Sequence, residues 1–551
     1  MAKTPRISGA PLRTLAASTR AAPVRSLLAR VLREQLGINA VRALGDEVRG
    51  ELPMSVRPIR ARRSYDRPSE GLGVPTVGVW PHSSSSYVEA YGSGRVTPRQ
   101  IAERALAAAR DLATRSVGPV HVYDDSRALE AAAAATGRWK ADRALGPLDG
   151  VPVVIKEEMA VRGLPTRLGT SFLPEDGAPA DGTIVARLRA AGAVILGHSP
   201  MTEFGMSPIG VNGHRPMPRN PHDPGRAAGG SSTGSAVAVS TGLVPVALGA
   251  DGGGSIRTPA CLTGVLGLKP TFGLLSRSGG GLVNTVTHFG PIASTTADMA
   301  RFLEAVSGED PADELTSAAP ALAPGVLVAA LGRGVRGLRI GVADEEWSVA
   351  AEPIARAGRA ALAALEKEGA VLVPIRMPLA RHAAAIGYLT IGLEEFAGLH
   401  EVRRSHRDKL GPDLQMTLSG LEAFQPDDYL DGQRLRAGLR REVATVLGDV
   451  DVLALPTTGC AAPAITDAEA RGGFLDPPVL DALCRFAFLA NLTGLPAGTA
   501  PVGRDGDGLP VGLQIVADAW DDATVLQVLA HLERMEVARV VRPRVSVDLL
   551  V

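Results

Sequence analysis

The sequence predicts an α/β protein, and two observations support this. First, helical segments alternate with short apolar runs such as GVPVVIK (150–156) and VPVALGA (244–250). Nearly continuous apolar character is typical of strands that are buried on both faces of a sheet. Second, hydrophobic residues make up 45% and charged residues 21% of the 551 residues, as in ordinary globular proteins, and 63 glycines favour close packing and tight turns.

Regular alternation of helices and strands begins near Tyr87. The segment TPRQIAERALAAARDLATR (97–115) is predicted to be a helix, because Thr97 can cap it and Pro98 suits its first turn. The next predicted elements are a helix at 127–141, a strand at 150–156, a helix at 181–191, and strands at 193–197 and 244–250. A serine-rich segment lies between the last two strands.

The chain divides into four predicted regions. They are a basic N-terminal extension with a Pro/Gly/Ser-rich linker (1–86), the first part of the core (87–319), an inserted helical cap on the substrate side (320–449) and the C-terminal part of the core (450–551). The cap region opens with a Pro/Ala spacer, a strand at 338–344 and an Ala-rich helix at 352–368, and a polar helical stretch follows. Strands return at 450–458 and 509–518, before a final helix at 522–535.

The N-terminal extension is strongly basic. Through Arg63 it holds thirteen Lys and Arg against four acidic residues. The segment RSLLARVLREQL (25–36) spaces its leucines and valine as on one face of a helix, with arginines between them, and so predicts a basic amphipathic helix. Three interpretations stay open: packing on the main domain or on a second subunit of a homodimer, peripheral contact with anionic lipid, and a transit-like targeting segment.

Charge and cysteine usage exclude several classes of protein. Lys plus Arg and Asp plus Glu both number 58, so no excess positive charge is present to hold nucleic acid. Cys261, Cys460 and Cys484 are odd in number and far apart, which argues against disulfides and zinc thiolates and fits a reducing cytoplasm. The histidines lack metal-ligand spacing, and no apolar run approaches the roughly 18 residues of a membrane-spanning helix. The start of the chain also lacks the apolar region of a secretory signal.

Two motif matches carry little weight. GRGVRG (332–337) satisfies GxGxxG, but a predicted strand follows it where a phosphate-binding loop needs a helix. GSSTG (230–234) satisfies GxSxG at Ser232, but the stretch RNPHDPGRAAG precedes it where a hydrolase elbow needs a strand. A flexible Gly/Ser linker is also disfavoured, because an Ala-rich helical segment follows the serines at once.

The residues suggest a serine nucleophile with a lysine base. Lys156 ends an apolar strand, so its amine would be desolvated unless it meets polar partners such as serines. In DGGGSIR (251–257), consecutive glycines free backbone N–H groups to converge on an oxyanion, and Ser255 ends that run. From these residues alone, Ser255 could be the nucleophile or a relay between the base and another serine.

The passage from GVPVVIKEEM through GGSSTGSAVAV to DGGGSIRTPACLTGVLGLKPTFG resembles the amidase signature family. The separations of 75 (231 − 156) and 24 (255 − 231) residues agree with the Ser–Ser–Lys triad of that family. The resemblance extends from about Tyr87 to the C-terminal PTTGCAAPAI (456–465) and LPVGLQIVAD (509–518) segments. It implies an amidase-signature fold with a large mixed central β-sheet covered by helices on both faces.

The resemblance also implies a mechanism. Ser255 is the expected nucleophile, Ser231 the bridging serine in a cis Gly230–Ser231 peptide, and Lys156 the base. The backbone N–H groups of Gly252, Gly253, Gly254 and Ser255 are expected to form the oxyanion hole. Ser232, Asp251, Arg226 and Arg257 are expected as supporting residues, with a surface ion pair as the competing interpretation for the charged ones. No cofactor and no metal are implied.

Within the family, NPHDPGRAAGGSSTGS and SGGGLVNTVTHFGPIAST look most similar to fatty acid amide hydrolases of the plant type. This favours N-acyl amides with long acyl chains, such as N-acylethanolamines, as substrates for a cytoplasmic enzyme that contacts a membrane surface peripherally. The alternatives are a soluble amidase for aryl or short amides, an amidotransferase A-type subunit and, from a different class, an inactive scaffold that binds acyl amides.

Overall fold

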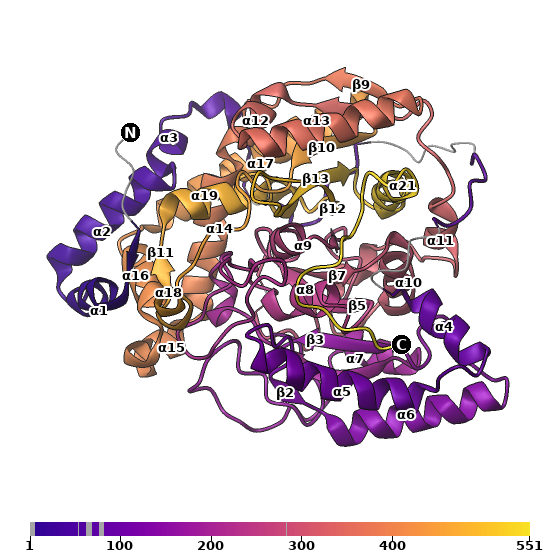
Figure 1. The fold of residues 1–551 in the computed structure, drawn as a ribbon. Coiled ribbons are helices and arrows are strands. Elements are labelled where there is room, and N and C mark those ends of the chain that lie inside the picture. Colours follow the sequence, from indigo (N-terminus) through magenta and orange to yellow (C-terminus); the bar gives the residue numbers. More distant parts are fainter. Residues whose placement is uncertain (1–5, 53, 62–68, 76–81, 283) are drawn as a thin grey trace.

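The computed structural model describes residues 6–52, 54–61, 69–75, 82–282 and 284–551. Eleven strands in these ranges form one mixed sheet, in the order β2-β4-β3-β5-β7-β6-β12-β13-β10-β8-β9 (Figure 1). The strands are β2 (Val122–Tyr123), β3 (Pro152–Lys156), β4 (Val194–Ser199), β5 (Val246–Asp251), β6 (Leu266–Lys269), β7 (His288–Ala293), β8 (Arg339–Val342), β9 (Val371–Pro374), β10 (Val452–Pro456), β12 (Ala497–Arg504) and β13 (Pro510–Ala517).

Helices cover both faces of this sheet, so the expected fold class is confirmed (Figure 1). Those of the core are α4 (Ser84–Gly92), α5 (Pro98–Thr114), α6 (Asp125–Lys140), α7 (Thr183–Ala190), α8 (Thr233–Ser240), α9 (Arg257–Thr263), α10 (Thr296–Val306), α11 (Val326–Ala330), α12 (Asp344–Ser348), α13 (Glu352–Lys367), α18 (Asp467–Gly472), α19 (Pro477–Cys484), α20 (Phe488–Thr493) and α21 (Asp522–Arg534). Helix α5 begins as predicted. The Thr97 hydroxyl accepts the Gln100 backbone N–H, and the Gln100 side-chain oxygen accepts the Thr97 backbone N–H.

Strand direction places the catalytic candidates at one edge of the sheet. Strands β4, β3 and β5 are adjacent and parallel, so their carboxyl ends meet at the same edge. Lys156 is the last residue of β3, and Asp251 is the last residue of β5. All residues of both strands are buried, as expected for strands with nearly continuous apolar sequence.

The region 320–449 differs from the expected cap. Its strand β8 pairs in parallel with β10, and β9 pairs with β8, so both belong to the edge of the central sheet. The cap is therefore narrower than predicted and consists of helices that follow β9. They are α14 (Ala383–Gly398), α15 (His400–Ser405), α16 (Pro412–Leu421) and α17 (Pro426–Asp449).

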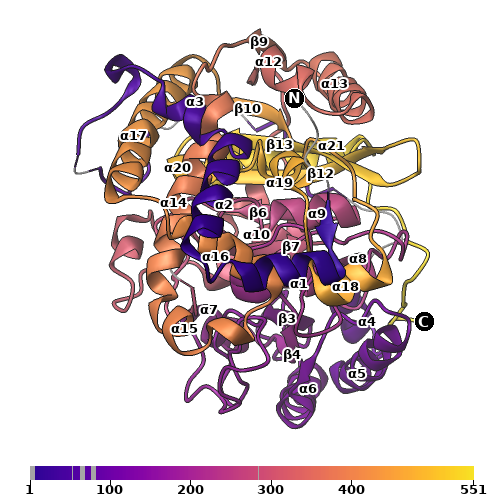
Figure 2. The same ribbon diagram turned by 90° about the vertical axis from the view of Figure 1, so that its left-hand side faces the viewer.

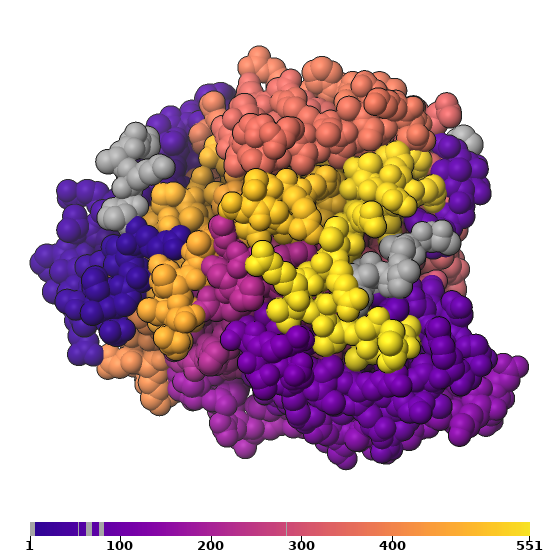
Figure 3. Space-filling view, in the orientation of Figure 1, coloured from indigo at the N-terminus to yellow at the C-terminus, as the bar shows by residue number. Residues whose placement is uncertain are grey.

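The N-terminal extension packs on these cap helices. It forms α1 (Gly9–Ser18), α2 (Ala22–Gln35) and α3 (Ile38–Arg42), and a short strand β1 (Ile7–Ser8) pairs with β11 (Phe474–Leu475). Helices α1 and α2 lie against α16, and α3 lies against α14 (Figures 1 and 2). Leu12 and Ala16 are buried against Met416. Figure 3 shows the extension beside the cap helices at one end of the molecule.

The predicted basic amphipathic helix thus exists as α2, and it packs on the main body of its own chain. The linker predicted before Tyr87 falls partly on 67–68 and 76–81, outside the described residues, and α4 begins at Ser84. None of the helices within the described ranges is long and apolar enough to span a bilayer.

A glycine in α17 tests how the extension is held. A Cβ atom at Gly438 would overlap the backbone carbonyl of Val48, whereas a Cβ at Gly137, an exposed position of α6, would meet no described atom within 4 Å apart from the backbone of its own helix. Alanine normally stabilises a helix by about 1 kcal/mol relative to glycine. We expect Gly137→Ala to be neutral or stabilising in thermal unfolding. Gly438→Ala should lower the melting temperature and speed proteolysis within residues 6–52. Equal behaviour of the two variants would contradict this packing.

Candidate active site

Lys156 and Ser231 form the centre of the site. The Lys156 side chain is 1% exposed, and its Nζ donates to Ser231 Oγ at 2.8 Å. Ser231 is buried in the loop before α8 and follows a cis peptide bond, Gly230–Ser231. The serine that the sequence analysis placed between base and nucleophile therefore lies in contact with the lysine.

Ser255 lines a small cavity. It follows β5, just before α9, and lines the same cavity as Lys156 and Ser231. The backbone carbonyl of Ser255 accepts the Ser232 N–H at 3.2 Å, which joins the two serine-bearing loops directly. The fold thus gathers Lys156, Ser231 and Ser255 around one space, although they are far apart in sequence.

Ser232 fixes the start of α8 to β5. Its Oγ donates to the Ala250 carbonyl at 3.1 Å and lies 3.2 Å from the Ala250 N–H, which donates to it. Both groups belong to Ala250, the residue before Asp251, and the glycine run follows Asp251. Ser232 therefore sets the spacing between the Ser231 loop and the Ser255 loop.

Asp251 and Arg257 form an ion pair without solvent exposure. The Arg257 Nε and Nη2 lie 3.0 and 2.9 Å from the two Asp251 oxygens, in bidentate geometry. Burial alone would raise the pKa of Asp251, but the guanidinium and the Asn491 amide hold that pKa well below its usual range. Arg257 also bonds to Asn491, to Gln514 and to the Ala487 carbonyl. The pair anchors the glycine run to α20 and β13.

The glycine run is held from within by the same carboxylate. Asp251 Oδ1 accepts the Gly254 N–H at 2.7 Å, and Oδ2 accepts the Ile256 N–H at 3.1 Å. The Gly254 N–H was expected in the oxyanion hole, but its bond to Asp251 takes it out of that set. Gly254 has φ +117°, which side chains rarely adopt, and a Cβ at Gly253 would lie 2.5 Å from the Phe488 ring.

Arg226 does not support the glycine run, contrary to expectation. Its guanidinium bonds to Asp507 and the Ala462 carbonyl and lies 3.7 Å from Asp223. These partners belong to surface loops, and the side chain is partly exposed. The competing interpretation, a surface ion pair, describes Arg226.

Two carboxylic acids in the site, Glu158 and Glu395, were not predicted from the sequence. Glu158 Oε2 lies 2.7 Å from Lys156 Nζ, and both side chains are buried. Glu395, on α14, lines the same cavity and accepts a bond from Asn284 at 2.7 Å. Desolvation raises the pKa of Glu395 to about 7, with a further increase from Glu158 and Glu394 against the opposing effects of Asn284 and Lys156. Glu158 had a signal in the sequence, because alternate residues at a strand end share one side.

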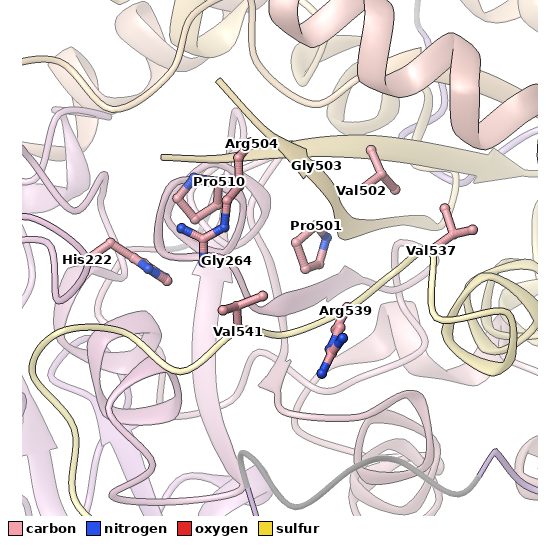
Figure 4. Close-up of a pocket in the computed structure, with 10 residues that line it drawn as sticks. All are labelled: His222, Gly264, Pro501, Val502, Gly503, Arg504, Pro510, Val537, Arg539 and Val541. Carbon is pink, nitrogen blue, oxygen red and sulfur yellow. The ribbon is translucent and has the colours of Figure 1, made fainter. Parts of the chain in front are cut away.

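The nearest histidine in sequence to the serine cluster, His222, lies in a different hollow. Figure 4 shows it beside Gly264 and Arg504, with Val541 across from it. Its Nε2 contacts the Thr263 carbonyl at 3.1 Å, and burial lowers its pKa to about 4. The partner of His222 is therefore a backbone carbonyl. The cavity that Ser231 and Ser255 line contains Lys156, Glu158 and Glu395 instead.

A larger apolar cavity of about 360 Å³ shares Ser255 with the small cavity that Lys156 and Ser231 line. Ser255 and Gly253 line it, and α2 of the N-terminal extension forms part of the wall with Leu28 and Leu32. Further walls come from α14, α16, the loop after α16, α19 and α20, with mostly apolar residues that include Ile391, Met416, Leu421, Phe424, Leu480 and Phe488.

Comparison with known proteins identifies the family. The family model described as Amidase matches residues 103–526. The chain belongs to the amidase family. The fatty acid amide hydrolase of Arabidopsis thaliana is 34% identical over 499 residues, covering 88% of this chain and 81% of that protein. The A-type subunit of the glutamyl-tRNA(Gln) amidotransferase from Chloroflexus aurantiacus is 35% identical, covering 83% and 97%.

Solved structures agree with this assignment. A protein from a complex connected with the evolutionary origins of an s-triazine catabolic enzyme has a TM-score of 0.77 at 32% identity, covering 83% of this chain and all of that one. A bacterial aryl acylamidase of the amidase signature family has a TM-score of 0.74 at 25% identity, covering 82% and 96%. This amidase-family chain is an amide-hydrolysing enzyme with the amidase signature fold.

The buried pair and the surface pair can be compared directly. Arg257→Met leaves the Asp251 carboxylate buried without its counter-ion, which typically costs about 3–5 kcal/mol of folding free energy. Arg226→Met removes a partly exposed pair, worth about 0–1 kcal/mol. We expect chemical denaturation to show this difference. Similar losses for the two variants would show that Arg257 does not anchor the glycine run.

Proposed function

We propose that this amidase hydrolyses N-acyl amides with long acyl chains, such as N-acylethanolamines, through an acyl-enzyme on Ser255. Lys156 is the base, and Ser231 relays the proton between the two. The bond between Lys156 Nζ and Ser231 Oγ and the shared cavity support this assignment. The observation that carries the substrate class is the apolar cavity that runs from Ser255 to α2.

The proposed chemistry begins with neutral Lys156. The amine takes the Ser231 proton while Ser231 takes the Ser255 proton, and Ser255 Oγ attacks the amide carbon. The same relay then protonates the nitrogen, so that the carbon–nitrogen bond breaks with release of an amine. Water hydrolyses the acyl-enzyme by the reverse sequence of proton transfers.

The proposed oxyanion hole uses the backbone N–H groups of Gly252, Gly253 and Ser255. They follow β5 directly, and Asp251 and Arg257 hold this turn before substrate binds. Donors that are already oriented cost no reorganisation when charge develops on the carbonyl oxygen. The rigid anchoring of the glycine run is therefore part of the proposed mechanism.

The apolar cavity suits an acyl chain and offers little to a short polar amide. Its volume lies within the range of small-molecule sites, and apolar side chains dominate its walls. Burial of each methylene contributes about 0.8 kcal/mol, so affinity should increase with chain length until the cavity is full. A fatty acid amide hydrolase is also among the relatives that cover most of the chain.

We further propose that α2 meets a membrane surface. Leu27 and Val31, which line the cavity, are 58% and 38% exposed, and the exposed Arg30 lies between them on the same helix. A basic helix with exposed apolar residues favours the interface of anionic lipid. Substrate dissolved in a bilayer would then meet the mouth of the cavity directly.

The first test is amine release from a series of N-acylethanolamines and from short and aryl amides. We expect kcat/KM to increase with acyl length in the wild type and activity to vanish in Ser255→Ala and Lys156→Ala. Hydrolysis of aryl or short amides alone would keep the triad and overturn the lipid assignment. Activity only with added partner subunits would favour an amidotransferase subunit. Specific binding without turnover would favour an acyl-amide scaffold.

A cavity-filling variant tests the acyl site. Leu421→Trp places a larger side chain in the wall of the cavity, and we expect the preferred acyl chain to shorten while short amides are hydrolysed at the wild-type rate. Leu430→Trp, at a position 46% exposed on α17, is the matched control. An unchanged chain-length profile in Leu421→Trp would mean that the acyl chain lies elsewhere.

A further inference from the structure

The contact between Lys156 and Glu158 raises a chemical requirement. A lysine ammonium has three N–H donors and no lone pair, so it cannot accept a proton from Ser231. A carboxylate 2.7 Å from Nζ favours the ammonium form. The base must therefore lose a proton before catalysis, although its side chain is buried away from solvent.

We infer that Glu158 takes this proton and thereby converts Lys156 into the base. The inference rests on the proposed triad. One N–H bond of the ammonium breaks, an O–H bond forms at Glu158 Oε2, and the ion pair becomes a neutral amine beside a carboxylic acid. Lys156 then takes the Ser231 proton as Ser231 takes that of Ser255. After turnover the acid returns its proton to Nζ, so no proton is gained or lost.

Burial makes this transfer reasonable. Two charges in a low-dielectric interior lose most of their hydration, and their mutual attraction compensates only part of that loss. The neutral pair avoids the loss, and the short distance lets a proton cross without a water molecule. Glu158 has little exposure through which solvent could stabilise its charged form.

The other carboxylates near Lys156 and Glu158 have partners of their own. Asp251, at the end of β5, lines the cavity but is paired with Arg257. Glu394 on α14 accepts bonds from Thr285 and from Tyr429 of α17. Arg436 of α17 also donates to Thr285.

Glu395 completes these surroundings. The Asn284 oxygen accepts from Val286 and Thr287, which turns its NH₂ group toward Glu395. Burial raises the pKa of Glu395 to about 7, which favours its neutral form beside Glu158. Lys156 and Glu158 are then the pair between which the proton moves.

The inference has a distinctive pH signature. In the wild type, the active form is the neutral Lys156 amine beside the Glu158 carboxylic acid. It holds the same number of protons as the ion pair, so the balance between the two does not change with pH. Activity is lost in acid only when both Lys156 and Glu158 are protonated. In Glu158→Gln the active form holds one proton fewer than the resting form, so kcat/KM should fall about tenfold per pH unit on the acid limb. The acid limb of the profile should therefore move to higher pH by at least about one unit.

The experiment measures kcat/KM for decanoyl 4-nitroanilide from about pH 5.5 to about pH 9.5 in the wild type, Glu158→Gln, Glu158→Asp and Glu395→Gln. We expect Glu158→Asp to restore part of the wild-type profile and Glu395→Gln to shift the acid limb less than Glu158→Gln. An acid limb that stays in place or moves to lower pH in Glu158→Gln would overturn the inference. That result is expected if Glu158 only stabilises the ammonium, because its removal would then make the neutral amine easier to form. Equal shifts in Glu158→Gln and Glu395→Gln would also overturn it.

Two measurements separate this inference from other failures. Thermal unfolding of each variant shows whether a loss of activity reflects a loss of fold, in which case the profile of Glu158→Asp decides. If the wild type cleaves neither the anilide nor the N-acylethanolamines, or Ser255→Ala still cleaves them, the proposed function fails. If both behave as expected and the acid limb of Glu158→Gln does not rise, only the role of Glu158 fails.

Discussion

The buried contact between Asp251 and Arg257 holds the parts of the active site in one arrangement. A carboxylate and a guanidinium without solvent exposure are stable only if their remaining hydrogen-bonding groups are satisfied. Asp251 is satisfied by backbone N–H groups of its own loop, and Arg257 by Asn491, Gln514 and a backbone carbonyl. The loop that carries Ser255 is thereby connected to α20 and β13, and the backbone of its glycine run is held in one conformation.

Around this anchor, parallel strand geometry brings the reacting groups together. Lys156 and Asp251 end neighbouring parallel strands, so the proposed base and the start of the glycine run meet at one edge of the sheet. Ser232 then fixes the third segment, since it bonds to β5 and its N–H reaches the Ser255 carbonyl. Each catalytic candidate lies in a loop or at a strand end, but each is held by a buried regular element.

Much of this could be predicted from the sequence, for local reasons. The apolar run that ends at Lys156, the Thr97 cap and the glycine run each reflect a preference of a few adjacent residues, and the structure has strands, helix and turn at those places. The edge strand β9 was not predicted, because VLVP (371–374) is four residues long and becomes a strand only through its neighbour β8. Glu395 reaches the site from a distant helix, and Arg226 bonds to loops far along the chain, so neither placement had a local pattern.

The N-terminal extension has a consequence for how the chain folds. Helices α1 and α2 are synthesised well before α16, yet both pack on it, and the bond between Ser419 and Thr19 joins residues 400 positions apart. Contacts of such separation form late, because loop closure must precede them. On a ribosome, the apolar face of α2 therefore lacks its α16 partners until residues 412–421 have emerged. The part of the cavity wall that α2 contributes beside Ser255 is therefore completed only after α16 has been synthesised and has packed on the N-terminal helices.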